Sequence, residues 1–348
     1  MKQSNRLIGG LIDRGRTVSF SFNDQRFEGY PGDTLASALL ANGQRLIARS
    51  FKYHRPRGIF SAGSEEPNAL VELRSGAHLE PNTRATVTEL YEGLEATSQN
   101  HRGSLRCDLL AVNDLLSPFL AAGFYYKTFM WPRSFWERIY EPIIRASAGL
   151  GRLSGEPDPD SYDKRFLHCD VLIIGSGPSG ITAALAAGRA GARVILADED
   201  FQMGGRLNSE TYDVSGETGA NFVGEALAEL GSIDNVQLMP RTTVYGAYDH
   251  GIYGALERKT DHLPSSGDGP RQILWRVYAK RAILSAGATE RPIAFGNNDR
   301  PGVMLAGAVR AYVNRWGVVP GKKVAVFTNN DDGWRTATDL ASKGVEIS

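Results

Sequence analysis

A glycine-rich segment near the middle of the chain has the spacing of a dinucleotide-binding loop. The segment GSGPSG supplies Gly175, Gly177, Pro178, Ser179 and Gly180, between the apolar run DVLII and the Ala-rich run ITAALAAGRAG. In a strand–loop–helix context, Gly175 permits a tight turn, Gly177 lets the backbone approach a pyrophosphate, and Gly180 allows close helix–strand packing. The N–H groups at the start of the helix would then bind the phosphates.

Three consecutive acids follow the next predicted strand, in the run RVILADED. They are Asp198, Glu199 and Asp200, and Asp198 comes 18 residues after Gly180. We expect Asp198 to accept hydrogen bonds from an adenosine ribose. Because a carboxylate there would repel a 2′-phosphate, the sequence favours NAD or FAD over NADP.

Further residues are predicted to lie near the same ligand. Gly205 would let the backbone approach the diphosphate, and Arg206 would offer charge-assisted hydrogen bonds, although a solvated loop is the alternative interpretation. Val244, in the run RTTV, is where such domains contact the adenine edge through the backbone, and an ordinary core valine is the alternative. Ala286 and Gly287 end a strand that would point at the same crevice.

A second strand–helix turn, in the segment TNNDDG from Thr328 to Gly333, lacks most of the expected glycines. Because two aspartates stand where a phosphate would approach, we predict that this second crevice does not bind a dinucleotide in the usual way. No catalytic set is evident: no second cysteine follows Cys169, the six histidines lack metal-ligand spacing, and no G-x-S-x-G motif occurs.

Composition excludes several classes of protein. The 348 residues hold 39 Lys+Arg and 39 Asp+Glu, so no overall field favours nucleic acid. Two cysteines cannot form a disulfide framework, which indicates a reducing compartment. The most apolar stretch, residues 109–131, is interrupted by polar residues and proline, and the N-terminus lacks the pattern of a secretory signal. We therefore expect a cytoplasmic protein without a membrane segment.

The pattern of elements predicts four segments. Residues 1–95, with strands over 17–22, 26–30, 68–73 and 84–90 and a helix over 35–43, indicate a small β-grasp-like domain. Residues 96–165 form an aromatic-rich connector, whose aromatics include Phe124, Tyr125 and Tyr126 and are expected to pack between domains. Residues 166–290 form a first dinucleotide-binding domain, and residues 291–348 begin a second, degenerate one. An open α/β sheet should not end at Ser348, so we expect a fragment of a longer polypeptide.

Three stretches of the chain resemble one family closely. They are SFKYHRPRGIFSAGSEEPNALVEL (50–73), GFYYKTFMWPRSFWERIYEP (123–142), and DVLIIGSGPSG (170–180) together with GATERPIAFGNNDRPGVM (287–304). In these stretches the chain is similar to the N-terminal part of the alpha subunit of heterotetrameric sarcosine oxidases. The resemblance implies an α+β and α/β fold: a ferredoxin-like β-grasp module, then a glutathione-reductase-like two-dinucleotide fold that is incomplete at its C-terminus.

The first stretch also resembles the ferredoxin-like modules of related amine and amino-acid dehydrogenases, which hold a [2Fe–2S] cluster on a C-x4-C-x2-C run and a fourth cysteine. The matching positions here are Ser61, Glu66 and Ala69, and the fourth falls near Thr86. Thiolates are needed to hold such iron. We therefore expect no iron–sulfur cluster, which favours the sarcosine oxidase resemblance over the cluster-bearing relatives.

The resemblance implies an assembly of alpha, beta, gamma and delta subunits. In that family an amine substrate, sarcosine, is oxidised at FAD on beta, electrons pass to FMN near the alpha–beta interface, and oxygen becomes hydrogen peroxide. The one-carbon unit passes to tetrahydrofolate on a C-terminal domain of alpha, or leaves as formaldehyde. The alpha subunit binds NAD, which implies contacts at Ser179, Asp198, Glu199, Asp200, Arg206 and Val244. Arg206 departs from the small hydroxyl residue expected there, and the resemblance implies no catalytic residue in this chain.

Other interpretations remain open from the sequence. One is an alpha subunit of an opine, proline or cyanide-forming dehydrogenase complex, and another is a scaffold whose nucleotide is purely structural. A free-standing flavin reductase is opposed by the missing dithiol, the degraded second loop and the N-terminal module. The basic loop from Arg49 to Arg57 is either a solvated loop or a contact with a partner subunit or a flavin phosphate.

Overall fold

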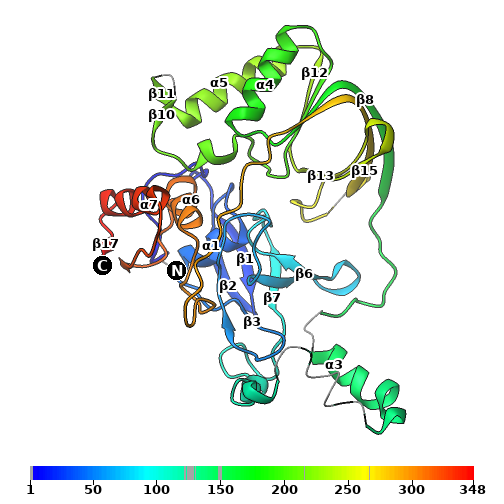
Figure 1. Ribbon diagram of the computed structural model, residues 1–348, viewed down its shortest axis with the longest axis vertical. Coiled ribbons are helices and arrows are strands. Elements are labelled where there is room, and N and C mark those ends of the chain that lie inside the picture. The colour runs from blue at the N-terminus through cyan, green and yellow to red at the C-terminus, as the bar shows by residue number, and fades with distance from the viewer. Residues whose placement is uncertain are drawn as a thin grey trace. The chain divides into compact units, whose positions relative to one another are not determined.

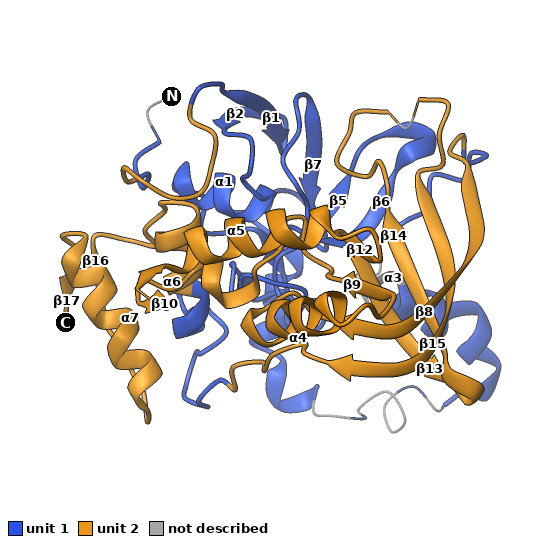
Figure 2. Cartoon of the chain, turned by 90° about the horizontal axis from the view of Figure 1, so that it is seen from above, with its two compact units in different colours: residues 1–6, 15–158, 292–308 blue, residues 7–14, 159–291, 309–348 orange. Residues whose placement is uncertain are grey.

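The computed structural model describes residues 3–120, 123, 129, 131–147, 151–214, 216–265 and 267–348. Its contacts divide the chain into two compact units (Figure 2). Unit 1 consists of residues 1–6, 15–158 and 292–308, and unit 2 of residues 7–14, 159–291 and 309–348. Phe124, Tyr125 and Tyr126 of the predicted connector lie outside the described residues.

Unit 1 contains a mixed sheet in the order β2-β1-β7-β5-β6. Its strands are β1 (Val18–Phe22), β2 (Gln25–Gly29), β5 (Leu70–Leu73), β6 (Glu80–Arg84) and β7 (Leu94–Ser98). Asn23 and Asp24 both have positive φ, as a tight two-residue hairpin between β1 and β2 requires. β1 pairs in parallel with β7 on its other side, so the hairpin is joined to the later strands of the unit.

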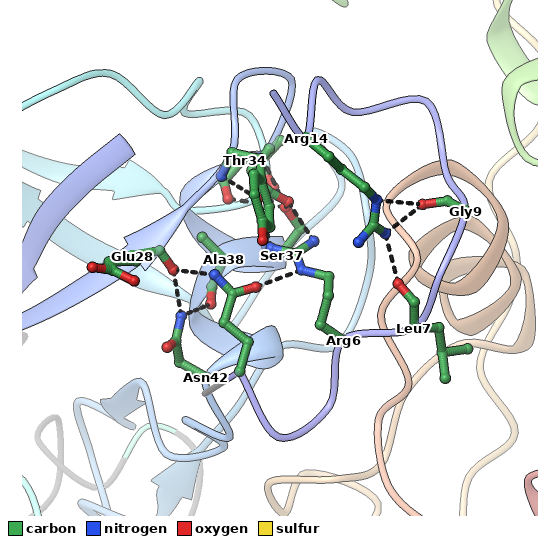
Figure 3. Close-up of polar contacts among 12 residues, drawn as sticks. Arg6, Leu7, Gly9, Arg14, Glu28, Thr34, Ser37, Ala38 and Asn42 are labelled. Atoms are coloured by element: carbon green, nitrogen blue, oxygen red, sulfur yellow. Dashed lines mark hydrogen bonds and ion pairs between the residues drawn. The ribbon is translucent and has the colours of Figure 1, made fainter. Parts of the chain in front are cut away.

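Helix α1 (Leu35–Ala41) packs all seven of its residues into the core of unit 1. Thr34 and Ser37 form a capping box, in which each side chain accepts a hydrogen bond from the other residue's backbone N–H. At the other end of the helix, Asn42 donates to the carbonyl oxygens of Ala38 and Glu28, both at 2.8 Å (Figure 3).

The strand predicted over residues 84–90 is wrong. The strand in this region is β6 (Glu80–Arg84), and residues 85–90 lie outside any strand. The carbonyl of Thr88 accepts a hydrogen bond from Leu35 N (2.8 Å), and that of Ala85 accepts one from Ala36 N (2.9 Å). Residues 85–88 therefore satisfy the N–H groups at the start of α1, which a continued strand could not do.

The remaining elements of unit 1 are short. They are β3 (Ala48–Arg49), β4 (Pro56–Arg57), α3 (Glu141–Ser147), the 3₁₀ turns Gly76–His78, Leu109–Asp114, Ser117–Phe119 and Arg133–Phe135, and a π turn, Trp136–Tyr140.

Unit 2 is built on a six-stranded sheet in the order β12-β9-β8-β15-β14-β13. Four parallel strands, β8 (Tyr162–Ile174), β9 (Val194–Ala197), β12 (Val236–Met239) and β15 (Gln272–Leu284), are continued by antiparallel β14 (Ile252–Arg258) and β13 (Thr242–Tyr248). The two longest strands, β8 and β15, run side by side (Figure 1). Their carboxyl ends, Ile174 and Leu284, pair at the same edge of the sheet.

Strand alternation divides the core of unit 2 into two layers. Ile173 and Leu196 pack against α4 (Pro178–Arg189) and α5 (Gly219–Ser232), in a cluster that includes Ile181 and Leu230. Leu172 and Ile195, one residue earlier on the same strands, lie in the cluster on the opposite face. This is the pattern of a sheet that is buried on both sides.

The last elements of the chain are α6 (Ala306–Arg315), β16 (Lys323–Val324), α7 (Asp331–Ser342) and β17 (Glu346–Ile347). Residues 7–14 run alongside the end of α6: Leu11 N donates to Arg315 O (2.6 Å) and Leu7 N to Gly317 O (2.7 Å). Arg14 closes this segment by donating to the carbonyl oxygens of Leu7 and Gly9 (Figure 3). Unit 2 also contains β10 (Asp213–Val214), β11 (Glu217–Thr218) and the 3₁₀ turns Gly205–Asn208 and Asp249–Gly251.

Within the described ranges, no helix has both the length and the apolar character needed to cross a bilayer.

The two cysteines differ in their surroundings, and a chemical difference follows. Cys107 is exposed, whereas Cys169 is buried on β8. Burial, with a contribution from neighbouring Asp170, raises the pKa of the Cys169 thiol to about 11. Because the thiolate is the reactive form, we expect iodoacetamide at pH 8 to label Cys107 alone in the native protein and both thiols after denaturation. Mass spectrometry of the peptides checks this, and native labelling of Cys169 at a rate similar to that of Cys107 would contradict it.

Candidate functional site

The glycine loop lies between β8 and α4, where packing requires glycine at two of its three positions. Gly175 has φ +98°, and a Cβ there would lie 2.5 Å from the carbonyl oxygen of Ser285. A Cβ on Gly180 would collide with the carbonyl oxygen of Gly175. Gly177 is different, because its φ is −66° and a Cβ there would meet nothing within 4 Å. Glycine at position 177 thus leaves open space beside the loop, as a close-lying ligand would need.

Gly177 is also the N-cap of α4, and Pro178 occupies the first turn. The first hydrogen bond of the helix runs from Ile181 N to Gly177 O (3.0 Å), so the N–H groups of Ser179 and Gly180 precede it. Pro178 and Ser179 are exposed. A helix start of this kind provides N–H donors and a favourable dipole for an anion.

Asp198, directly after β9, holds the glycine loop. Its carboxylate accepts hydrogen bonds from the backbone N–H and the hydroxyl of Ser176, both at 2.6 Å, and from Asp200 N at 2.8 Å. The Ser176 hydroxyl in turn accepts a hydrogen bond from Gly204 N at 3.1 Å. Ser176 is fully buried, so this network connects the loop at 175–180 with the glycine pair at 204–205.

The two glycine segments touch each other. A Cβ on Gly205 would lie 2.9 Å from Gly177 Cα, and Gly205 has φ +54°. The structure therefore brings together the two backbone segments that the sequence assigned to the diphosphate.

The other two acids have different surroundings. Asp200 forms a two-point ion pair with Arg315, with distances of 2.5 and 2.8 Å. Glu199 is exposed, and its carbonyl oxygen accepts a hydrogen bond from Arg258 (2.6 Å). Three acids that are equivalent in sequence thus differ in the contacts that their side chains make.

Arg206 contacts acids rather than pointing into open solvent. It lies 2.8 Å from Glu210 and 2.9 Å from Asp332. Arg310, which is 1% exposed, contacts the same two carboxylates at 3.0 and 2.8 Å. Burial alone would raise the pKa of Asp332, but hydrogen bonds from Arg310 and Arg206 outweigh it and hold that pKa below its usual range.

The remaining predicted contact residues lie on two other strands. Ala286 and Gly287 follow β15 and are exposed, and Ser285 N donates to Ile174 O (2.8 Å) beside the loop. Val244 lies on β13 and packs against the core cluster of Leu172 and Ile195. The start of β13 is close to the acids, because Thr242 N donates to Asp198 O (2.7 Å).

The second predicted turn has no open glycine of this kind. The Asn330 side chain caps α7 by accepting from Asp332 N (3.0 Å), and a Cβ on Gly333 would collide with Thr328. Asp332 is held by the two arginines described above.

The arginines of the basic loop in unit 1 have internal partners. Arg49 donates to the carbonyl oxygens of Leu105, His54 and Arg106. Arg55 and Arg57 both pair with Asp299, which belongs to the same unit. Neither a fully solvated loop nor a set of uncommitted charges describes them.

Sequence reasoning missed Ser176, Arg310 and Arg315. Ser176 occupies a variable position of the glycine motif, where spacing gives no signal. Arg315 follows its partner Asp200 by 115 residues, so only the folded chain reveals the pair. Across the described part of the chain, no group of three or more His, Cys, Asp or Glu side chains is arranged to hold a metal ion.

The fold and the glycine loop define a class of protein. Residues 170–229 match the family of FAD-dependent oxidoreductases, and residues 15–101 match the family of 2Fe-2S iron–sulfur cluster binding domains. Among solved structures, L-proline dehydrogenase from P. horikoshii has a TM-score of 0.65 at 21% identity, covering 99% of this chain and 55% of that one. At this identity the likeness shows the fold alone.

The chain is homologous to the alpha subunits of sarcosine oxidases over nearly its whole length. It is 56% identical to the protein from Rhizobium meliloti (strain 1021) over 97% of this chain, and 38% identical to that from Corynebacterium sp. (strain P-1) over 96%. It covers 34% and 30% of those relatives, and so spans about a third of their length. One component of the opine oxidase of Agrobacterium tumefaciens (strain Ach5) is 29% identical over 51% of the chain. Because the sarcosine oxidase relatives are alpha subunits, they imply a multi-subunit oxidase.

The match of residues 15–101 corrects one prediction from the sequence. The absence of ligand cysteines led to the expectation of no iron–sulfur cluster, and the match to the 2Fe-2S cluster binding family contradicts it. The β-grasp pattern of the whole module, rather than four positions, determines family membership. Residues 15–101 hold no cysteine, so we assign no electron-transfer step to them.

A buried carboxylate organises the loop that contains those positions. Glu66 accepts hydrogen bonds through Oε2 from the backbone N–H groups of Phe60 (2.9 Å) and Ser61 (2.6 Å). Through Oε1 it accepts from Asn68 N (2.8 Å) and Ala69 N (3.0 Å). Glu66 is 2% exposed, so these donors are also out of reach of water.

We expect Glu66→Gln to destabilise unit 1 by about 2–4 kcal/mol, because the new amide NH₂ would face backbone donors that lose their acceptor. Chemical unfolding monitored by circular dichroism measures this change. Glu65→Gln, at the exposed neighbouring residue, is the matched control and should leave the midpoint unchanged. Equal midpoints for the two variants would show that the Glu66 contacts do not hold the loop.

Proposed function

We propose that this chain is the nucleotide-binding part of the alpha subunit of a flavin-dependent sarcosine oxidase complex. The observation that carries the proposal is 56% identity to such a protein over 97% of the chain. The proposed reaction converts sarcosine to glycine, with hydrogen peroxide and either formaldehyde or methylenetetrahydrofolate. The proposed partners are beta, gamma and delta subunits, with FAD and FMN mainly on beta and tetrahydrofolate on a part of alpha beyond these residues.

We propose that this chain itself binds NAD. The open space beside Gly177, the start of α4 and the contacting backbone at Gly205 fit a diphosphate. The acids at the end of β9 would select a free ribose hydroxyl over a 2′-phosphate. Bound NAD would supply a hydride-accepting nicotinamide, and the residues of this chain bind and orient it. No side chain here is proposed as catalytic.

Oxygen uptake by the complete protein, purified with its partner subunits, tests the proposed reaction. Sarcosine should drive oxygen consumption with stoichiometric hydrogen peroxide, and L-proline and an opine should be much slower. Faster turnover of proline or an opine would overturn the proposal. It would favour the second candidate, an opine or proline dehydrogenase complex, which the opine oxidase similarity supports.

Asp198→Ala distinguishes a redox or regulatory nucleotide from a structural one. A nucleotide that only stabilises the scaffold predicts less intact complex with unchanged turnover per complex. A large loss of turnover in fully assembled complex would contradict the scaffold interpretation.

A further inference from the structure

The acidic segment after β9 is held by a buried arginine from a distant part of the chain. Arg315, the last residue of α6, is 7% exposed and pairs with both oxygens of Asp200. Its guanidinium also lies 5.1 Å from the ring centre of Phe201 and 4.5 Å from that of Trp316. An arginine that is both bidentate and stacked has one allowed orientation, so it fixes its partner firmly.

The other side of the segment is held as well. Asp198 is tied to Ser176, and Glu199 lies exposed between the two anchored aspartates. The backbone continues the restraint, because Arg241 N donates to Asp200 O (3.0 Å) and Leu11 N donates to Arg315 O (2.6 Å). The position of the exposed carboxylate therefore depends on both anchors.

We propose that the Arg315–Asp200 pair is a positioning device that sets the preference of this site for NAD over its 2′-phosphorylated form. The inference rests on the proposed function of the site as an NAD site. An acid that accepts a hydrogen bond from the ribose and repels a 2′-phosphate discriminates only when its position is fixed. The pair also neutralises Arg315, whose charge would otherwise attract a 2′-phosphate.

Dissociation constants for NAD and for NADP, measured by calorimetry on the complete protein with its partner subunits, test the inference. Arg315→Lys keeps the charge but loses the fork and the stacking surface. It should weaken NAD binding ~10-fold and change NADP binding less than about twofold, so the NADP/NAD ratio of dissociation constants falls. Asp200→Asn should lower the ratio further, because it leaves the Arg315 charge uncompensated.

Arg271→Lys is the matched control. Arg271 is also buried, at 4% exposed, and pairs with Asp160 and Asp261. It precedes β15, whose 13 residues separate it from the site by about 40 Å at the usual rise per residue. This variant should lose stability as Arg315→Lys does and keep the ratio of the unaltered protein.

The ratio separates positioning from mere support of the fold, because destabilisation alone weakens both ligands equally. An unaltered protein that binds NAD, with both site variants retaining its ratio, would overturn the inference and leave the proposed function standing. An unaltered protein that binds neither nucleotide would overturn both.

Discussion

Replacing Gly177 by alanine is expected to weaken NAD binding at least ~10-fold without changing the thermal unfolding temperature. The reason is geometric. Gly177 has a φ that alanine adopts readily, and a Cβ there would meet nothing within 4 Å in the protein. The added methyl would instead occupy the space that we assign to the diphosphate. Calorimetric titration with NAD and differential scanning calorimetry measure the two quantities.

Gly224→Ala is the matched control for this substitution. Gly224 lies within α5, and a Cβ there also meets nothing within 4 Å. Its replacement should leave NAD affinity unchanged and slightly raise the unfolding temperature, since alanine is the better helix former. Undiminished NAD affinity in Gly177→Ala would show that the nucleotide does not approach the backbone at this position.

Replacing Arg310 by methionine is expected to give the largest loss of stability, about 3 kcal/mol. Arg310 is 1% exposed and pairs with Glu210, whose side chain is 4% exposed, and with Asp332. Methionine fills much of the volume but leaves two carboxylates with only Arg206 to compensate them. The retained Arg206 contacts place the expected loss at the lower end of the range for broken buried pairs.

Urea denaturation followed by tryptophan fluorescence measures the loss, with Arg189→Met as the control. Arg189 makes a two-point pair with Glu229 at 2.6 and 2.7 Å, but its side chain is 60% exposed. Exposed pairs contribute little to stability, so this variant should unfold close to the unaltered protein. Equal losses for the two variants would mean that the buried network around Arg310 carries no special weight.

The glycine loop was predictable because its constraints are local. The turn at Gly175 and the close packing at Gly180 are encoded within a few residues of each other, and the structure shows both close contacts. The strands β1, β2 and β9 were also predictable, because alternation or a short apolar run defines each of them. The predicted strand at 84–90 failed because residues 85–88 hydrogen-bond to the start of α1, which is a tertiary requirement.

The partners of the acids could not be predicted, since they come from distant segments. Asp198, Glu199 and Asp200 form one acidic run in the sequence, yet Ser176 and Arg315 give two of them fixed positions. Arg206 has the chemistry of a phosphate ligand, yet Glu210 and Asp332 lie within 2.9 Å of it. The role of each residue in nucleotide binding remains a prediction for the variants above.

The nucleotide content of the natively purified complex tests the central claim most directly. After denaturation, chromatography and mass spectrometry identify every released nucleotide. The proposal predicts non-covalent NAD, together with one covalent and one releasable flavin per complex. Released FAD without NAD would contradict it, and would reassign the site between Gly175 and Asp198 to a flavin.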